Sequence, residues 1–420
     1  MDNFKKKSAM LKIILSLSLV LLIFVIGLAF FARPKISDNE KRELTKFPTF
    51  TLSSFLSGEF TSQVSLWFSD TYPLRESMIE ANGALQELYG IRDEQVIGGG
   101  EADDIPAGPA DIVFNPTDDG KGESFEGMYL NGDTAYQLYF FNKQNSDSYV
   151  ALINKFAASV EGKANVYDMI VPLHYQIALS EATVNKYGAS DCEEAIDYMY
   201  GNLDSSIITV DTLPQLISHN QEYLYFRTDH HWTARGAYYA YLAFCEEKGI
   251  TPTPLVAYQR LQFEGFLGTF YANAKQPTAM KQNPDYVEAF VPTGTNEEKV
   301  YDSNGNLIAE YAVVFTKADK YDPGNKYQTF IGGDQPLIEI HNPKINDGSS
   351  IVVIKESYGN AFVPFLVDSY EYVYVIDYRH WSGSLSDFVV TNGIDDVLFL
   401  NVVNTTSTSA RLKELSVIIK

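Results

Sequence analysis

Residues 351–362 read Ile-Val-Val-Ile-Lys-Glu-Ser-Tyr-Gly-Asn-Ala-Phe, an apolar run that stops at a polar turn. Four consecutive β-branched residues without polar alternation are typical of a strand that is covered on both faces, as in parallel sheets. Gly359 ends the turn, and the apolar residues after it are compatible with a helix. A strand, turn and helix in this order can expose the Ser357 hydroxyl beside free backbone N–H groups, which could stabilise an oxyanion.

Further apolar runs alternate with helix candidates from about residue 127 onward, which favours an α/β fold. One helix is sharply delimited at residues 234–248, with Thr233 as its N-cap and Gly249 past its end. Residues 251–345 instead alternate polar and apolar stretches with Pro and Gly, which indicates a strand-rich insertion. We therefore expect a mostly parallel sheet with helices on both faces. The expected strands are residues 166–171, 207–210, 223–226, 351–354, 372–376 and 397–402.

The N-terminal residues 13–32 contain no charged side chain. Twenty residues at a helical rise of about 1.5 Å extend about 30 Å, the thickness of a hydrocarbon core, so this stretch is predicted to span a membrane. Four lysines precede it against one aspartate, which favours residues 1–12 as a cytoplasmic tail. Bulky Phe30 lies two positions before Ala32, the best candidate for a cleavage site, so we expect an uncleaved anchor and an exported remainder.

Residues 33–126 are expected to form a stalk, membrane-proximal helices and an acidic loop. Residues 61–92 have helix-like apolar spacing that Pro73 interrupts. Residues 98–126 are rich in Gly, Pro and Asp, as loops are. The α/β domain would then occupy residues 127–420, with the insertion at about 251–345.

The composition excludes several classes of protein. With 54 acidic against 32 basic residues the chain has a net charge of −22, so it repels nucleic acid and anionic headgroups. Two cysteines, Cys192 and Cys245, exclude a disulfide framework; one bridge is possible, and free buried thiols are favoured. No CxxC or HExxH spacing is present, which disfavours a metal site. No cofactor is predicted.

Two of the six histidines adjoin in Thr-Asp-His-His-Trp-Thr at residues 228–233, after an expected strand. Strand ends are where α/β sheets place their sites. Residues two apart in an extended segment point the same way, so Asp229 and His231 would face one pocket while His230 points elsewhere. A carboxylate on one imidazole nitrogen prepares the other to act as a base, and Ser357 is the best candidate nucleophile. Taken alone, such a serine is more often a turn residue.

Polar residues at other strand ends are candidates for substrate binding. Tyr378, Arg379 and Asn404 follow two of the expected strands, and Tyr358 adjoins the candidate nucleophile. An Arg or Asn at such a place could bind a carbonyl oxygen or a sugar hydroxyl, although solvated loop residues are common there. His174 follows another strand and is interpreted as a rim or core histidine; a metal site with Asp229 and His231 is the less favoured alternative.

Three sequence blocks in this order resemble the bacterial DHHW family, which is named for the four residues at 229–232. The blocks are residues 67–76 (WFSDTYPLRE), 228–233 (TDHHWT) and 355–360 (KESYGN). The resemblance covers most of residues 37–404. Proteins of this family look like relatives of the alginate O-acetylation proteins, whose domains are similar to SGNH hydrolases, so the resemblance implies an SGNH hydrolase-like three-layer sandwich.

The resemblance also implies a Ser-His-Asp arrangement with Asp229 as orienter, His231 as base and Ser357 as nucleophile. It implies an extracytoplasmic O-acyltransferase, most simply an O-acetyltransferase, that modifies a cell-surface polysaccharide or exopolysaccharide. Because acyl-CoA is absent outside the cell, the acyl group must be handed across the membrane. The resemblance implies that a multi-span membrane-bound acyltransferase does this, and the anchor would hold the two proteins together. Lys355-Glu356 departs from the Gly-Asp that typically precedes an SGNH nucleophile. An acetyl esterase and an inert glycan-binding or assembly protein are the alternatives.

Overall fold

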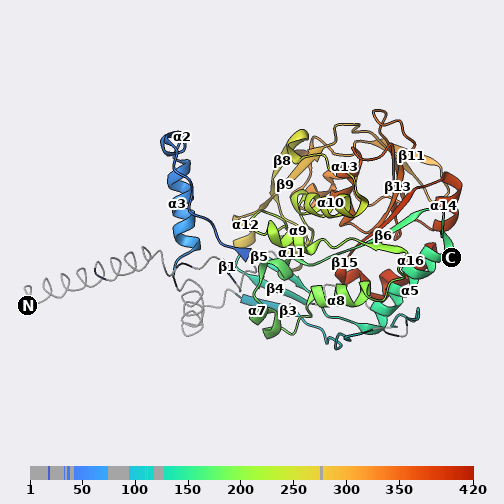
Figure 1. The fold of residues 1–420 in the computed structure, drawn as a ribbon, viewed down its shortest axis with the longest axis horizontal. Helices are drawn as coiled ribbons and strands as arrows, with labels where there is room; N and C mark the ends of the chain where they lie inside the picture. The colour runs from blue at the N-terminus through green and yellow to red at the C-terminus, as the bar shows by residue number, and fades with distance from the viewer. Residues whose placement is uncertain are drawn as a thin grey trace, which may run out of the picture. The chain divides into compact units, whose positions relative to one another are not determined.

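The computed structural model describes residues 18, 33, 36–37, 42–73, 94–108, 110, 112–117, 127–274 and 278–420. It divides the chain into two compact units, Met1–Arg92 and Asp93–Lys420 (Figure 1). The second unit thus begins before residue 127, where the sequence places the domain boundary. The reason is that β3 (Glu94–Gly98) pairs antiparallel with β4 (Gly127–Asn131) across the predicted acidic loop.

The predicted membrane span at residues 13–32 lies outside the described residues, except for Ser18. Within the described part of the chain, no helix has both the length and the apolar character needed to cross a bilayer. The anchor and the cytoplasmic tail therefore stay predictions.

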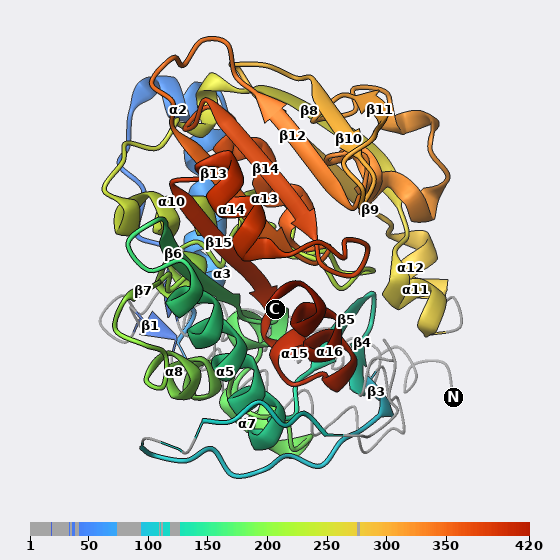
Figure 2. The same cartoon turned by 90° about the vertical axis from the view of Figure 1, so that its right-hand side faces the viewer.

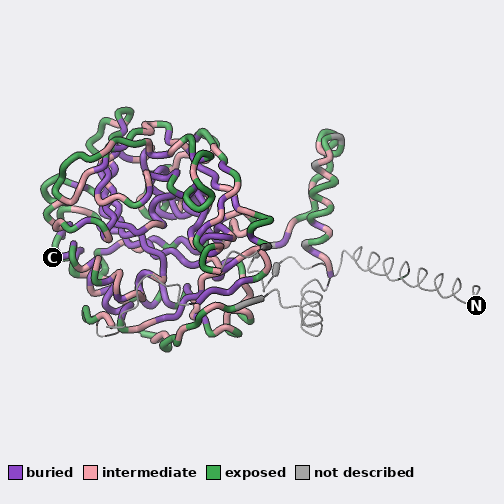
Figure 3. Tube along the Cα trace, turned by 180° about the vertical axis from the view of Figure 1, so that it is seen from behind, coloured by how far each residue is buried: buried purple, intermediate pink, exposed green. Residues whose placement is uncertain are grey.

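Among its described residues, the first unit contains the helices α2 (Leu52–Leu56) and α3 (Glu59–Asp70), after the paired strands β1 (Ile36–Ser37) and β2 (Arg42–Glu43). A reciprocal capping box between Thr51 and Ser54 starts α2. The second helix ends three residues before Pro73, at the predicted break. Both helices are mostly exposed (Figure 3). The rest of the predicted helical region, including Arg75, lies outside the described residues.

An eight-stranded sheet forms the centre of the second unit, in the order β11-β10-β12-β14-β13-β15-β6-β7 (Figure 2). The five strands from β14 to β7 are parallel, and β12, β10 and β11 are antiparallel. The sheet is therefore mixed, because the insertion adds its own antiparallel strands to the edge at β14. The strands are β6 (Asn165–Val171), β7 (Ile207–Thr209), β10 (Glu298–Tyr301), β11 (Leu307–Tyr311), β12 (Leu337–His341), β13 (Ser350–Lys355), β14 (Tyr372–Asp377) and β15 (Asp396–Val402).

The prediction of a strand at residues 223–226 is wrong. Only an isolated bridge joins Tyr225 to Trp232. The backbone N–H of Phe226 donates to the carbonyl of His231, and that of Thr233 donates to the carbonyl of Leu224. The segment folds back on itself, so its polar groups are satisfied within the turn and not by a sheet neighbour.

The helix predicted at residues 234–248 is confirmed as α10 (Ala234–Lys248). The Thr233 side chain accepts from the N–H of Gly236, and Gly249 ends the helix in the left-handed region at φ 73°. The other main helices of the second unit are α5 (Lys143–Ser159), α6 (His174–Ala178), α7 (Glu181–Lys186), α8 (Cys192–Tyr200), α9 (Leu213–Ser218), α13 (Gly359–Leu366), α14 (Leu385–Asn392), α15 (Val403–Thr406) and α16 (Ser409–Ile418).

Helices cover both faces of the large sheet. On one face, Phe156 of α5 packs against Phe399 of β15, with ring centroids 5.2 Å apart. On the other, Phe244 of α10 packs against Tyr167 of β6 at the same distance. Tyr167 is in register with Leu398, the neighbour of Phe399, so Tyr167 and Phe399 project from opposite faces. The expected layers of helix, sheet and helix are present.

The insertion is rich in strands, as predicted, and two of its strands form a separate hairpin, β8 (Gln259–Phe266) with β9 (Asp285–Val291). Between them lie α11 (Thr269–Asn273) and α12 (Thr278–Gln282). A three-stranded sheet of β3, β4 and β5 (Thr134–Leu138) completes the second unit. Cys192 and Cys245 are both buried and not bridged.

Candidate active site

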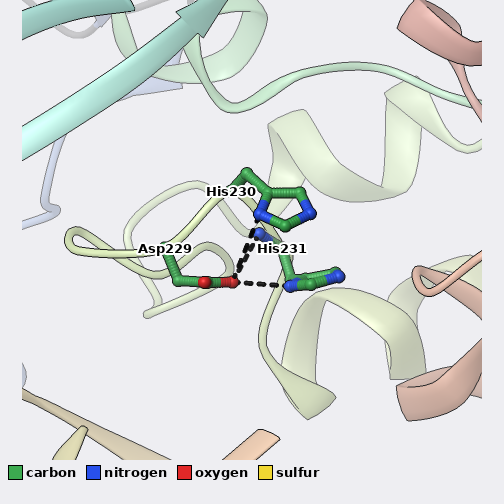
Figure 4. A group of neighbouring side chains, drawn as sticks. All are labelled: Asp229, His230 and His231. Atoms are coloured by element: carbon green, nitrogen blue, oxygen red, sulfur yellow. Dashed lines mark hydrogen bonds and ion pairs between the residues drawn. The ribbon is translucent and has the colours of Figure 1, made fainter. Parts of the chain in front are cut away.

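Asp229, His231 and Ser357 form a hydrogen-bonded series. Nδ1 of His231 lies 2.5 Å from Oδ1 of Asp229, and Nε2 lies 2.7 Å from Oγ of Ser357, 126 residues away in the sequence. Figure 4 shows the Asp229 carboxylate facing the His231 ring. Since the carboxylate holds a proton on Nδ1, the lone pair at Nε2 is directed at the serine hydroxyl. This geometry is that of a nucleophile with its base and an orienting acid.

The Asp229 carboxylate is buried and has hydrogen-bond donors on both of its oxygens. Oδ1 accepts the N–H of His231 at 3.1 Å, and Oδ2 accepts the N–H and hydroxyl of Thr269 at 2.8 and 3.1 Å. Gly268 permits this approach, because a Cβ at that position would collide with the carboxylate. Burial raises the pKa of Asp229, but the His231 and His230 rings outweigh burial and hold the pKa well below its usual range.

The parity of an extended segment predicts that His230 points away from the site, but its side chain points into the site. Its ring lies 3.8 Å from that of His231, and it lines the same cavity. The prediction is wrong because residues 227–231 turn instead of extending. Nδ1 of His230 lies 2.7 Å from Oγ1 of Thr269, whose one hydroxyl proton goes to Asp229, so His230 donates here. Burial, followed by the neighbouring His231, lowers the pKa of His230 to about 3.

Trp232 and Tyr358 join the histidine segment to the serine turn. The indole N–H of Trp232 donates to the carbonyl of Tyr358 at 2.8 Å, and the hydroxyl of Tyr358 donates to the carbonyl of His230. Tyr327, from the insertion, stacks on His231 at 4.0 Å between ring centroids, and its hydroxyl donates to the carbonyl of Ser357 at 3.1 Å. The base and the nucleophile are therefore held by separate contacts on both sides.

Lys355 and Arg379 belong to an ion-pair network next to the nucleophile, in which Lys355 and Asp377 are buried and Asp334 is exposed. Nζ of Lys355 lies 2.9 Å from Asp377 and 3.3 Å from Asp334. The guanidinium of Arg379 pairs with the same two carboxylates at 2.6 and 2.8 Å. Burial raises the pKa of Asp377 and Asp334, but the two cations outweigh it and lower both pKa values. A Cβ at Gly359 would lie 2.6 Å from Cβ of Lys355, which explains the small residue there.

A cavity of about 750 Å³ has Ser357 and His231 in its wall. It lies at the carboxyl ends of β13, β14 and β15, the place expected for an α/β sheet. Amide and hydroxyl side chains make up much of its lining, with a few aromatic and charged residues among them. Its other lining residues include Gln137, Tyr139, Phe140, Thr269, Asn273, Tyr327, Gln328, Asp334, Gln335, Asn360, Thr405, Ser407, Thr408 and Arg411.

The predicted substrate-binding residues divide into two pairs. Arg379 and Asn404 line the cavity. Tyr358 and Tyr378 are buried in the core, and the hydroxyl of Tyr378 donates to Asn401 at 3.0 Å. Both tyrosines follow strand ends, but their rings turn inward, so the prediction of substrate contact is corrected for this pair. Both hydroxyls donate hydrogen bonds to groups inside the protein.

His174 is half-buried and does not line the cavity. Its ring stacks on Tyr225 at 5.0 Å, and burial lowers its pKa to about 3. Donor atoms of Asp229, His230 and His231 lie within 4.8 Å of one another, close enough to share an ion. Their hydrogen bonds to one another and to Thr269 already use the nitrogens nearest the carboxylate, so the arrangement is that of a base and its orienter.

Sequence reasoning missed the residues that support the site from the insertion. Thr269 bonds to Asp229, Tyr327 bonds to Ser357, and Asp334 pairs with Arg379, yet no motif marks these three residues. The pair Gly332-Gly333 before Asp334 is a turn signal, and both glycines have positive φ. That signal predicts a turn but not the partner across the cavity.

The fold and the site together define an α/β protein with a serine, histidine and aspartate in the spatial order of a serine hydrolase. The chain belongs to the DHHW protein family, which matches residues 40–120 and 103–376. A DHHW family protein from Eubacterium siraeum is 31% identical, with a TM-score of 0.62 over 68% of this chain and 94% of its own.

A more distant protein of known structure shares the fold. PatB1 of Bacillus cereus is 18% identical, with a TM-score of 0.57 over 67% of this chain and 97% of its own. The O-acetyltransferase domain of Pseudomonas putida AlgJ also matches, at 12% identity over 67% of this chain and 96% of the domain; its TM-score of 0.34 is too low to establish a common fold. Among curated protein sequences there is no significant match.

Proposed function

We propose that this protein is an extracytoplasmic O-acyltransferase, with acetyl as the acyl group and a polysaccharide hydroxyl as the acceptor. The hydrogen-bonded series Asp229–His231–Ser357 in the wall of a cavity carries the proposal. The motif resemblance to alginate O-acetylation proteins, within an SGNH hydrolase-like fold, supplies the acyl group and the acceptor class.

In the first half-reaction, Oγ of Ser357 attacks the acyl carbonyl while Nε2 of His231 takes the hydroxyl proton. Asp229 stabilises the imidazolium that forms. Collapse of the tetrahedral intermediate breaks the bond to the donor, whose leaving oxygen receives the proton from His231. The product is an acyl ester on Ser357.

In the second half-reaction, a sugar hydroxyl gives its proton to His231 and attacks the acyl ester. The acyl group passes to the sugar oxygen, and the proton returns to Ser357. The amide and hydroxyl side chains of the cavity wall, such as Gln137, Gln328 and Asn404, suit the hydroxyl groups of a sugar. Water in place of the sugar would give hydrolysis, the esterase alternative.

The location also belongs to the proposal. An anchor at residues 13–32 would keep the site on the outer surface, near a multi-span membrane protein that supplies the acyl group. Neither half-reaction above needs a metal or a cofactor.

The test uses purified full-length protein in detergent and its Ser357→Ala variant. We expect the wild type to hydrolyse an activated acetyl ester and to be labelled at Ser357 by a sulfonyl fluoride; a structure of PatB1 with a sulfonyl adduct is known. The variant should do neither. Added oligosaccharide should divert the acetyl group from water to sugar. A wild type that is inert toward both reagents would leave an inactive glycan-binding protein as the better explanation.

A further inference from the structure

Glu356 stands directly before the nucleophile, and its carboxylate is bound inside the site. The residue is only 5% exposed. Oε1 accepts the N–H of Val402 at 3.1 Å, and Oε2 accepts the N–H of Tyr358 at 3.0 Å. Oε2 also lies 3.3 Å from Oγ of Ser357. One side chain therefore ties the serine turn to the end of β15, the neighbouring strand.

Two backbone N–H donors require two acceptor oxygens, and a carboxylate supplies both. An amide in its place would set an NH₂ group against one of these buried N–H groups. Burial raises the pKa of Glu356, while Arg379 and the two N–H groups act in the opposite direction. The charged and titratable groups around the carboxylate are Arg379, His231, Tyr327, Tyr358 and Tyr378.

The carboxylate is also close to the base. Oγ of Ser357 lies 2.7 Å from Nε2 of His231 and 3.3 Å from Oε2 of Glu356. The nitrogen and the oxygen are thus at most about 6 Å apart, the sum of those two distances, and within that range an opposite charge favours the charged form of a group. Asp229 approaches His231 from the Nδ1 side, and Glu356 approaches from the Nε2 side.

We propose that Glu356 is a positioning residue that holds the Ser357 turn on β15 and adds a second negative charge in support of the His231 imidazolium. This inference rests on the function proposed above. A purely structural side chain would not affect the pH dependence of the reaction, whereas the charge of Glu356 would set part of it.

The experiment compares wild type with Glu356→Gln, Glu356→Asp and, as a control, Glu298→Gln. Glu298 of β10 is a second buried glutamate whose two oxygens have no hydrogen-bond partner among the described residues. The rate of Ser357 labelling by a sulfonyl fluoride, and of hydrolysis of an activated acetyl ester, is measured from acidic to alkaline pH. Thermal unfolding of each variant checks that it is folded.

We expect Glu356→Gln to lower the maximal rate at least about 10-fold and to move the acidic limb of the pH profile down by about one unit, since the lost charge no longer favours protonation of the base. Glu356→Asp keeps the charge but is one methylene shorter, so its maximal rate should fall while the acidic limb of its pH profile stays at the wild-type pH. Glu298→Gln should leave the limb in place.

An unmoved acidic limb in folded Glu356→Gln would overturn the proposal, because the residue would then act through packing alone. If Glu356→Gln does not fold, the Glu356→Asp variant provides the test. An acidic limb that moves to lower pH in Glu356→Asp, although the charge is kept, would also overturn the proposal. A wild type that reacts with neither probe would instead overturn the proposed function, and this inference with it.

Discussion

The indole N–H of Trp232 donates a 2.8 Å hydrogen bond to the carbonyl oxygen of Tyr358. Both side chains are fully buried, and the Tyr358 hydroxyl bonds in turn to the carbonyl of His230. The two partners lie next to His231 and Ser357 in the sequence. This pair of bonds therefore joins the segment that carries the base to the turn that carries the nucleophile, through the core of the protein.

Replacing Trp232 with Phe should weaken both the fold and the site. The Tyr358 carbonyl would be left buried and unpaired, which costs about 1–3 kcal/mol of unfolding free energy. The rate of Ser357 labelling should fall about 10-fold or more, because small misplacements of reacting groups are costly. Denaturant unfolding and labelling kinetics measure the two effects.

The control is Trp381→Phe, the same change at a buried indole that packs on Phe388. It should lower stability without a comparable loss of labelling. Equal losses of labelling in both variants would contradict the role given to the Trp232 bond.

Replacing Asp229 with Asn should nearly abolish reactivity while the fold persists. An amide at this place favours the tautomer with the proton on Nε2, so His231 could no longer accept the proton of Ser357. A drop in Ser357 labelling of about 10⁴-fold is expected. Asp285→Asn is the matched control, since that buried carboxylate bonds to Tyr223, Arg227 and Thr228 instead of an imidazole. If both variants keep wild-type labelling, Asp229 is not the orienter.

Gly268→Ala should disturb the site from outside the motif. The added methyl group would meet the Asp229 carboxylate and push it from the imidazole. Labelling of Ser357 should fall about 10- to 100-fold, and overpacking should cost about 1–3 kcal/mol of unfolding free energy. Gly108→Ala, where nothing lies within 4 Å of the new atom, should change neither quantity. Unimpaired labelling in Gly268→Ala would show that the carboxylate adjusts freely.

Sequence alone predicts the elements whose signals are local. The β-branched run before Ser357 and the capped helix at residues 234–248 are predicted with near-correct ends, because burial and capping act within a few residues. Asp229 does bond to His231, but residues 227–231 turn, so the extended backbone on which the spacing argument depends is not present. Residues 223–226 mislead, because an apolar run predicts burial and not the partner that its backbone will find.

The remainder of the site depends on contacts between distant segments. Tyr327 stacks on His231 only because the insertion folds over the strand ends, and no sequence signal near Tyr327 predicts that contact. The position of Tyr358 and Tyr378 after strands predicts substrate contact, whereas the direction of a ring is set by the core around it. Strand ends thus indicate where a site lies, and packing decides which side chains reach it.

The buried Glu298 should make the stability of the protein depend on pH. Burial raises its pKa to about 8, far above that of an exposed glutamate. In the unfolded chain the group ionises near its ordinary pKa of about 4.3. Between these two values the folded state holds a proton that the unfolded state has lost. The stability that the protonated Glu298 side chain allows is therefore fully present below its unfolded-state pKa, and it declines as the pH rises toward its folded-state pKa.

The Glu298→Gln variant carries a neutral side chain at this position at every pH, so it should not show this decline. The unfolding free energies of wild type and variant should nearly coincide at about pH 4.3 and separate as the pH rises, with the variant more stable by on the order of 3 kcal/mol at pH 7. Other buried carboxyls, such as Asp168 with a pKa raised to about 7 by burial, titrate in both proteins and cancel in the difference. Urea unfolding at several pH values measures the gap. Parallel curves would mean that Glu298 ionises in the folded protein as it does in water.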